Sequence, residues 1–374
     1  CGHGDAACGH GYGNCGHGYG NCGHGDAVCG HGVGPAEHGL AGWCGVYEKV
    51  RAVIRTIRRY PSRRSFGVVL TAVTALLLAS CGSDPAQARS AAVVGDHVIQ
   101  LDEVQAEVRW LLDHAPQAQQ AREQRRIDQI SSEIVRSRVV HELLAVAEER
   151  ENLRVDETKV DELIEASGGV EEAARNIAVE PSRVRDVARD QLLLEQLGKH
   201  YQHRLSVHFV GAMITESDAE ATDSEVARAL GRRIAADPAN VETILRDSGH
   251  QVIDRTITLA DALNQDPELA ISAVFGAEEG AVVVIRPSQQ QVGWLVALIK
   301  DRTVRSDVEE PEEDQPVDPR LLYWAGLRQL QPIADELGVQ INPRYGVWDD
   351  TGLAPAPSEE EVTGYQWESR TVQP

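Results

Sequence analysis

Residues 91–104 read AAVVGDHVIQLDEV, and this stretch decides how the fold begins. Apolar pairs stand on either side of Gly95-Asp96, two residues that suit the tight turn of a β-hairpin. Asp102 can then act as the N-cap of a helix, because apolar residues follow it at helical spacing: Val104, Val108, Leu111 and Leu112. The stretch therefore predicts a small hairpin that leads directly into a helix.

Helical periodicity continues beyond this hairpin through the first half of the main body. A long helix is expected over residues 121–150, and another starts at Asp156 and ends at Gly168-Gly169. A further helical turn covers residues 170–177, and Pro181 opens a last helix over residues 181–201. The fold class is therefore predicted to be α+β and predominantly α-helical.

Three motifs in this region resemble the N-terminal domain of SurA-like periplasmic chaperones and of PrsA-like lipoprotein foldases. The hairpin resembles the pattern A-V-V-x-G-x-x-I-x-x-x-E-V from Ala92 to Val104, with its glycine one position early, at Gly95. An acidic helix matches V-x-x-x-x-V-D-E-x-I over 155–164, and a later helix matches V-R-D-x-x-R-x-Q-L-L-L-E-x-L over 184–197. The resemblance implies a helical peptide-binding domain that carries no catalytic residues.

Residues 206–304 mix strands and helices in the place where this family carries a parvulin-type prolyl isomerase domain. VFGAEEGAVVVI (274–285) and VGWLVALIKDR (292–302) are similar to the closing segments of a parvulin. The expected order is one strand, two helical segments, a middle strand and two closing strands: 207–214, 223–236, 238–248, 252–259, and two strands around Pro287-Ser288. The resemblance implies a small α/β domain.

The residues that would catalyse proline isomerisation match the parvulin pattern only in part. Active parvulins usually have one histidine in the first strand and a second in the final strand, flanking an apolar proline pocket. His208 stands at the first position and is a weak catalytic candidate, whereas Leu295 occupies the second. Leucine neither donates nor accepts the hydrogen bonds of an imidazole. The family's Gly-Gly-Asp-Leu-Gly turn is missing too, so the domain is expected to be a degenerate parvulin.

The chain beyond this domain is expected to return to the helical one. EEPEEDQPVDP (309–319) has six acids and three prolines, which predicts an extended linker, placed at residues 305–316. An amphipathic helix over 321–337, closed by Gly338, should pack on the helices of residues 121–200, and residues 339–341 should join the hairpin. In SurA-like proteins the chain end completes the N-terminal domain, so residues 91–205 and 317–350 are expected to form one domain. Residues 351–374 are expected to be a disordered tail.

An export signal is predicted over residues 46–80. Residues 50–65 carry six arginines and no acid, and residues 66–80, FGVVLTAVTALLLAS, carry no charge. This uncharged stretch is shorter than the roughly 20 residues of a membrane-spanning helix. Its ending, Leu78-Ala79-Ser80-Cys81, resembles the lipobox of bacterial lipoproteins, which implies lipidation of Cys81 and a tether over residues 81–90. The alternative is a short buried helix that is followed by a cysteine by chance. Two export pathways stay open, the twin-arginine pathway and the Sec pathway.

The chain opens with a Cys/His/Gly repeat over residues 1–45, in which five units have a cysteine and a histidine separated by one glycine. Thiolate and imidazole are good ligands for zinc or copper, so a metal site is one interpretation, with candidate ligands Cys8, His10, Cys15 and His17. Most zinc sites, however, space paired ligands by about two to four residues. Because the repeat also precedes a signal peptide, we expect it to be translated upstream DNA rather than part of the functional protein.

The composition is acidic, with 58 acidic against 36 basic residues and a net charge of -22. Residues 1–80 hold seven basic and four acidic groups, so residues 81–374 retain 29 basic and 54 acidic groups. Such an excess does not suit nucleic acid, which needs a cationic surface. It also leaves acyl chains, rather than surface charge, to hold the protein at a membrane. No cofactor is expected, and no metal outside the repeat.

These features predict a membrane-tethered, extracytoplasmic chaperone or foldase at the outer face of the bacterial cytoplasmic membrane. Its partners would be unfolded or nascent exported polypeptides, bound on apolar surfaces. Aromatic candidates for a binding groove, or for the core, are Trp110, Tyr201, Tyr323 and Trp324. Two alternatives stay open: an active peptidyl-prolyl cis-trans isomerase of parvulin type, and an envelope scaffold or assembly factor without general chaperone activity.

Overall fold

The predicted hairpin is present in the computed structural model of the chain, which describes residues 89–215, 222–287, 293–306 and 316–369. β1 (Ser90–Val94) and β2 (His97–Gln100) pair antiparallel, and Gly95 turns between them with φ +56°. β7 (Val339–Ile341) pairs with the other side of β1. The predictions of a hairpin and of a returning third strand are both confirmed. All described residues belong to one of the chain's two units, Gly82–Pro374.

The first helices differ from the prediction at two points. α3 (Leu101–His114) starts directly after β2, so its N-cap is Gln100 and the predicted cap at Asp102 is wrong. Asp102 lies in the first turn, where its negative charge is favourable to the helix dipole. The predicted helix over 121–150 is two helices, α4 (Pro116–Glu123) and α5 (Ile127–Arg150), because Arg125 adopts a left-handed φ of +58° between them.

Three further helices form a smaller core of their own. α6 (Glu157–Ala166) is capped by Asp156, as predicted, and its carboxylate accepts a hydrogen bond from Thr158 N at 3.0 Å. α7 (Val170–Asn176) follows, and a 3-10 turn over Pro181–Arg183 leads into α8 (Val184–Gln202). Aliphatic side chains hold these elements together: Val160, Ile164, Ala173, Ala174, Val179, Val184 and Ala188.

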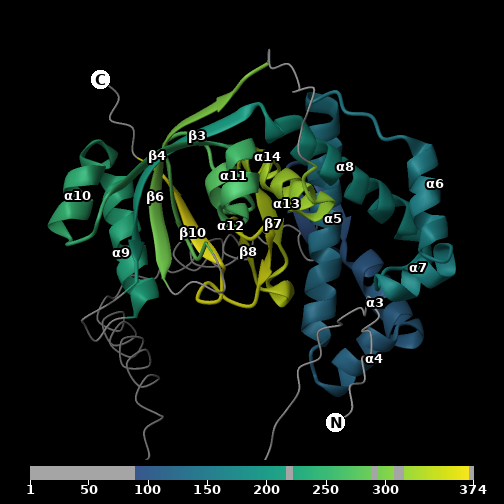
Figure 1. Cartoon of the computed structure of the whole chain (residues 1–374). Helices are drawn as coiled ribbons and strands as arrows, with labels where there is room; N and C mark the ends of the chain where they lie inside the picture. The colour runs from purple at the N-terminus through teal and green to yellow at the C-terminus, as the bar shows by residue number, and fades with distance from the viewer. Residues whose placement is uncertain (1–88, 216–221, 288–292, 307–315, 370–374) are drawn as a thin grey trace, which may run out of the picture. The chain divides into compact units, whose positions relative to one another are not determined.

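The main helical core includes residues from near the end of the chain. The predicted helix over 321–337 is present as α13 (Pro319–Arg328) and α14 (Gln331–Leu337), with Pro332 in the first turn of the second. α13 contacts α8 and α14 contacts α5, so the expected packing on residues 121–200 is confirmed (Figure 1). Buried residues of α3, α5, α8, α13 and α14 share one hydrophobic cluster.

A five-stranded antiparallel sheet, in the order β10-β5-β6-β3-β4, makes up the rest of the α+β fold. Its strands are β3 (Leu205–Ile214), β4 (Ile253–Thr258), β5 (Ala281–Ile285), β6 (Trp294–Val304) and β10 (Gly364–Glu368). Side chains alternate between the two faces. Helices α9 (Asp223–Ala236) and α10 (Val241–Asp247) pack on one face, while α11 (Leu259–Gln265) and α12 (Pro267–Ala270) pack on the other.

The expectation of a disordered tail from residue 351 is wrong for residues 351–369. β8 (Val347–Asp349) and β9 (Ala354–Ala356) form a hairpin, and β10 pairs with β5 at the edge of the large sheet. Buried Asp349 accepts hydrogen bonds from Thr351 and Thr363, which holds this segment in place. The low hydrophobicity of the segment is offset by these bonds and by strand pairing. The predicted acidic linker falls mainly on residues 307–315, which lie outside the described residues.

Candidate functional site

A cleft of about 340 Å³ lies on the helical part of the fold, between α3, α5, α8, α13 and the segment that follows α7. This volume is at the lower end of the roughly 300–1,000 Å³ that ligand sites in proteins occupy. Most of the lining side chains are apolar: Ile130, Ile134, Val140, Ile177, Ala178, Val179, Val187, Leu194, Tyr323 and Leu327. The polar lining residues are Glu107, Glu133, Arg136, Ser137, Arg183, Asp190 and Gln191.

Helical periodicity and two glycines build this cleft. Ile130, Ile134 and Ser137 recur at intervals of four and three residues, so they share one face of α5. A Cβ atom on Gly326 would lie 2.0 Å from the Leu194 carbonyl oxygen, and one on Gly198 would lie 2.0 Å from that of Leu322. Only glycine lets α13 approach α8 this closely. The close approach brings Tyr323 and Leu327 of α13 to the cleft wall.

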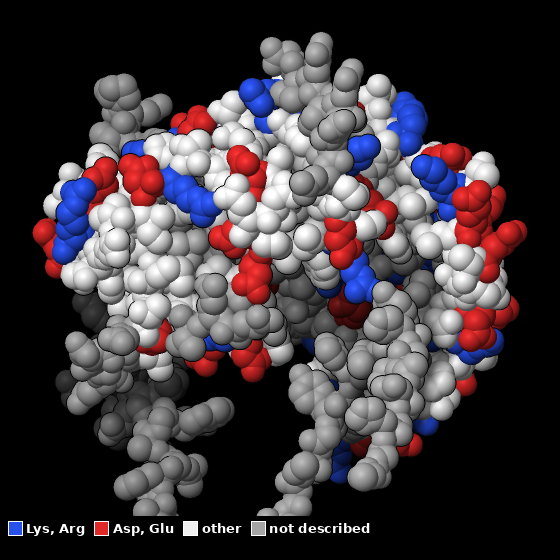
Figure 2. All heavy atoms as spheres, viewed as in Figure 1, with Lys and Arg blue, Asp and Glu red and all other residues white. Residues whose placement is uncertain are grey.

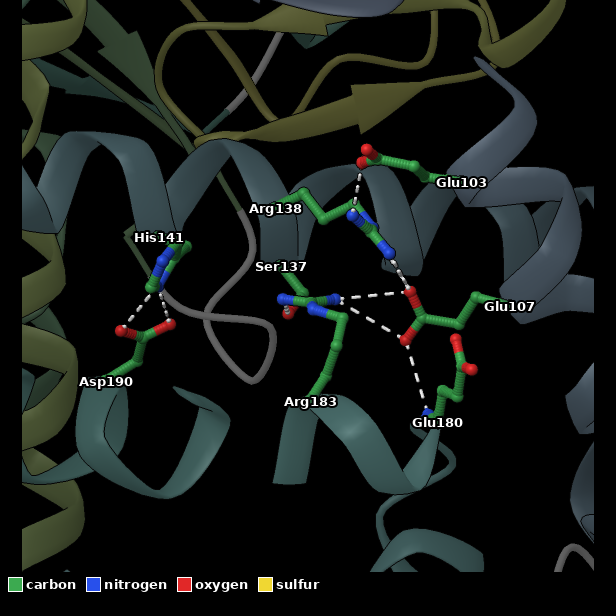
Figure 3. A network of polar contacts seen from close by, with 8 residues as sticks. All are labelled: Glu103, Glu107, Ser137, Arg138, His141, Glu180, Arg183 and Asp190. Carbon is green, nitrogen blue, oxygen red and sulfur yellow. Dashed lines mark hydrogen bonds and ion pairs between the residues drawn. The ribbon is translucent and has the colours of Figure 1, made fainter. Parts of the chain in front are cut away.

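A fully buried carboxylate, that of Glu107, joins three elements at the inner wall of the cleft (Figure 3). Arg138 donates to Glu107 Oε2 from Nε at 3.1 Å and from Nη2 at 2.9 Å. Arg183 donates from Nη1 to both carboxylate oxygens at 3.3 and 3.4 Å, and the backbone N–H of Glu180 donates at 3.4 Å. Glu107 thereby ties α3 to α5 and to the start of α8.

The outer part of the same network is more exposed to solvent. Arg138 Nη1 donates to Glu103 Oε2 at 2.9 Å, and the Glu103 side chain is 54% exposed. Arg183 Nη2 donates to Ser137 Oγ at 3.3 Å. Both guanidinium groups contact the buried carboxylate of Glu107, and that of Arg138 also contacts the exposed carboxylate of Glu103. This partial neutralisation offsets the cost of burying the two cations.

A second charged pair, His141 and Asp190, connects α5 to α8 next to the cleft (Figure 3). His141 Nδ1 lies 2.9 Å from each carboxylate oxygen of Asp190. The hydrogen bond to Asp190 raises the pKa of His141 above its usual value, against the opposing effect of burial. The imidazolium form is therefore favoured in the folded protein, and the pair strengthens the α5–α8 contact when His141 is protonated.

The two positions compared with parvulin histidines are not brought together. His208 lies on β3, where its Nε2 contacts Asp254 Oδ1 of β4 at 2.8 Å. Leu295 lies on β6, in the hydrophobic cluster under α11, and is in register with Met213 near the far end of β3. His208 is in register with Asp301 of β6, not with Leu295. Its two neighbours on β3, Val207 and Phe209, belong to the same hydrophobic cluster as Leu295, and neighbouring residues of a strand face opposite sides. The two side chains therefore face opposite sides of the sheet.

The aromatic candidates lie in different surroundings. Tyr323 lines the cleft, while exposed Trp324 contacts Arg136, whose guanidinium lies 5.7 Å from the ring centroid. Trp110 is partly buried and stacks on His114, with ring centroids 4.7 Å apart. Tyr201 packs against both large cores, and its hydroxyl donates to Glu151 at 2.7 Å. Of these aromatic residues, Tyr323 is in the cleft and Trp324 is beside a cleft residue.

Several predicted features lie outside the described residues: Cys81, the export signal, and the ligand candidates Cys8, His10, Cys15 and His17. Within residues 89–369, as far as they are described, no cluster of three His, Cys, Asp or Glu side chains could hold a metal ion. No helix in the described part of the chain is both long and apolar enough to cross a membrane.

Glu107, Arg138 and Arg183 were not predicted from the sequence, although one signal for Glu107 was present. Glu107 comes three residues after Val104 and four before Leu111, so it falls on the apolar stripe of α3. A carboxylate in such a stripe needs buried partners. The partners themselves are separated from Glu107 by 31 and 76 positions, and no spacing rule could have identified them. Compared with known proteins, the chain matches no family model and no curated protein.

Proposed function

We propose that this protein is an extracytoplasmic chaperone or foldase that binds unfolded exported polypeptides. In this proposal lipidated Cys81 tethers it to the outer face of the bacterial cytoplasmic membrane. The observation that carries the proposal is the largely apolar cleft of about 340 Å³, with Ile177 at its edge 49% exposed. Such a large exposed aliphatic side chain next to a cleft is suited to contact an apolar segment of another chain.

Two features of the fold support the same proposal. The hairpin is completed by a strand that returns from the end of the chain, which is what the resemblance to SurA-like chaperones implies. Residues 205–304 run in the order β3, α9, α10, β4, α11, α12, β5 and β6. Apart from α11 and α12, which separate the middle strand from the two closing strands, this is the order expected of a parvulin-like domain. Because His208 and Leu295 face opposite sides of the sheet, the proposal assigns no catalytic step to them.

Chaperone activity can be tested by the aggregation of a denatured model protein, followed by light scattering. The full chain should suppress aggregation, and Ile177→Asp should weaken suppression because it places a charge at the edge of the cleft. Val170→Asp is the matched control, since Val170 lies on α7, is 44% exposed and does not line the cleft. If the wild-type protein in molar excess leaves aggregation unchanged, the proposal is wrong.

The tether is tested separately by mass spectrometry of the protein from the membrane fraction of a bacterial host. The expected mature N-terminus is Cys81 with acyl groups attached, and Cys81→Ser should release the protein from the membrane. A different mature N-terminus would refute the proposed localisation and leave the proposed binding activity to the aggregation assay.

A further inference from the structure

The two arginines that line the cleft hold their partners only at long distances. Arg183 contacts Glu107 at 3.3 and 3.4 Å and Ser137 at 3.3 Å. Arg136 donates from Nε to the Leu353 carbonyl at 3.3 Å and from Nη1 to Glu133 at 3.4 Å. Charge-assisted hydrogen bonds are usually about 2.7–2.9 Å long. Both guanidinium groups therefore retain donor capacity, although their side chains are only 10% and 20% exposed.

The carboxylates of the cleft, in contrast, are bound by short contacts or lie in solvent. Glu107 accepts the closer pair of bonds from Arg138, a residue that does not line the cleft. Both oxygens of Asp190 lie 2.9 Å from His141, and the Glu133 side chain is 69% exposed. The donors still able to bind a ligand in the cleft are therefore those of Arg136 and Arg183, although the lining also carries three carboxylates.

Figure 2 shows acidic and basic side chains close together over the helical part of the fold, and the cleft itself is defined by the residues that line it. Apolar walls combined with the guanidinium groups of Arg136 and Arg183 suit a ligand that has a carboxylate directly beside an apolar group. A guanidinium matches a carboxylate by two parallel hydrogen bonds. In a polypeptide this combination occurs at the C-terminus, where the α-carboxylate and the last side chain share one Cα atom.

We propose that the cleft captures the C-terminal residue of an unfolded polypeptide when that residue is apolar, with Arg183 and Arg136 binding its α-carboxylate. This inference rests on the proposed chaperone function and specifies which part of a client the cleft recognises. The last side chain lies against the aliphatic wall of α5 and α8, and the preceding residues leave the cleft past Ile177.

The test uses the full chain and a peptide with an N-terminal fluorophore, Ser-Gly-Ser-Gly-Leu, followed by fluorescence anisotropy. The free acid should bind about tenfold more tightly, or better, than the C-terminal amide, because the amide removes a charge-assisted bond from a nearly buried site. A peptide of the same composition with the leucine moved to an internal position should also bind at least several-fold more weakly.

Variants are compared by the ratio of acid to amide affinity, which a merely structural role of the arginines would not change. Arg136→Gln and Arg183→Lys should both bring the ratio toward one; lysine keeps the charge but loses the fork. Arg189→Gln is the control, because Arg189 is partly buried and paired with Glu148 at 2.6 Å but does not line the cleft. It should keep the wild-type ratio. Circular dichroism establishes that each variant is folded.

The inference is overturned if the wild-type protein binds acid and amide equally, if it binds neither peptide, or if the ratio persists in both cleft variants. Should the protein still suppress aggregation in any of these cases, the chaperone proposal stands and C-terminal capture alone is wrong. Failure to suppress aggregation, with no peptide bound, refutes both.

Discussion

Replacing Glu107 by glutamine tests whether the buried network holds the helical part together. Glutamine keeps the shape of the side chain but removes its charge, so the cations of Arg138 and Arg183 lose the buried carboxylate between them. Removing one partner of a buried ion pair typically costs about 3–5 kcal/mol. Because Glu107 is fully buried and accepts from two arginines and one backbone N–H, the loss in unfolding free energy is expected within that range.

The assay is urea unfolding followed by far-ultraviolet circular dichroism, with Glu103→Gln as the matched control. Glu103 contacts Arg138 at 2.9 Å, but the Glu103 side chain is 54% exposed. Removing its charge should therefore lower the unfolding free energy by only about 0–1 kcal/mol. A loss of less than about 1 kcal/mol for Glu107→Gln, or a loss equal to that of the control, would refute the reasoning.

Three further predictions concern the packing around the cleft and the end of the chain. Gly326→Ala should lower the unfolding free energy by about 1–3 kcal/mol although alanine favours helix, because its Cβ would lie 2.0 Å from the Leu194 carbonyl oxygen. The pKa of His141 is raised in the folded protein chiefly by its hydrogen bond to Asp190, so the stabilisation from this pair is complete below the unfolded pKa of 6.5 and is lost as the pH rises through the folded pKa. Thermal melts should therefore show the advantage of the wild-type protein over His141→Gln shrinking as the pH is raised above 6.5. Asp349→Ala should cost more than about 2 kcal/mol and expose residues 351–369 to limited proteolysis, because Asp349 is a buried acceptor of several hydrogen bonds.

Local patterns in the sequence predicted those elements whose partners follow a simple rule. The apolar pairs around Gly95 specify a hairpin. Its third strand, Val-Gln-Ile at residues 339–341, was expected from the resemblance to SurA-like proteins rather than from a local pattern. The break between α4 and α5 was not predictable, because an arginine at φ +58° leaves the apolar periodicity on either side intact. Where the backbone conformation of a residue depends on tertiary contacts rather than on its sequence neighbours, apolar periodicity does not predict it.

The last strand shows the same limit more strongly. Residues 351–369 look too polar for a core, yet Tyr365 and Trp367 stack with ring centroids 5.8 Å apart. The guanidinium groups of Arg228 and Arg232, both on α9, lie 4.6 and 6.0 Å from these two rings. Such contacts join residues more than one hundred positions apart, so composition alone suggested disorder.

The unequal roles of three arginines link the stability of the fold to the site. Arg138 makes the short bonds to Glu107 and does not line the cleft, whereas Arg183 makes long ones and does. Since Arg138 occupies the better geometry, Arg183 stays close enough to the carboxylate to offset its own desolvation and still keeps donors for a ligand. Glu107 is then needed for stability and, indirectly, for binding, so a substitution there cannot separate the two. Arg136, whose acidic partner is exposed, is the residue at which binding can be removed while the buried network stays intact.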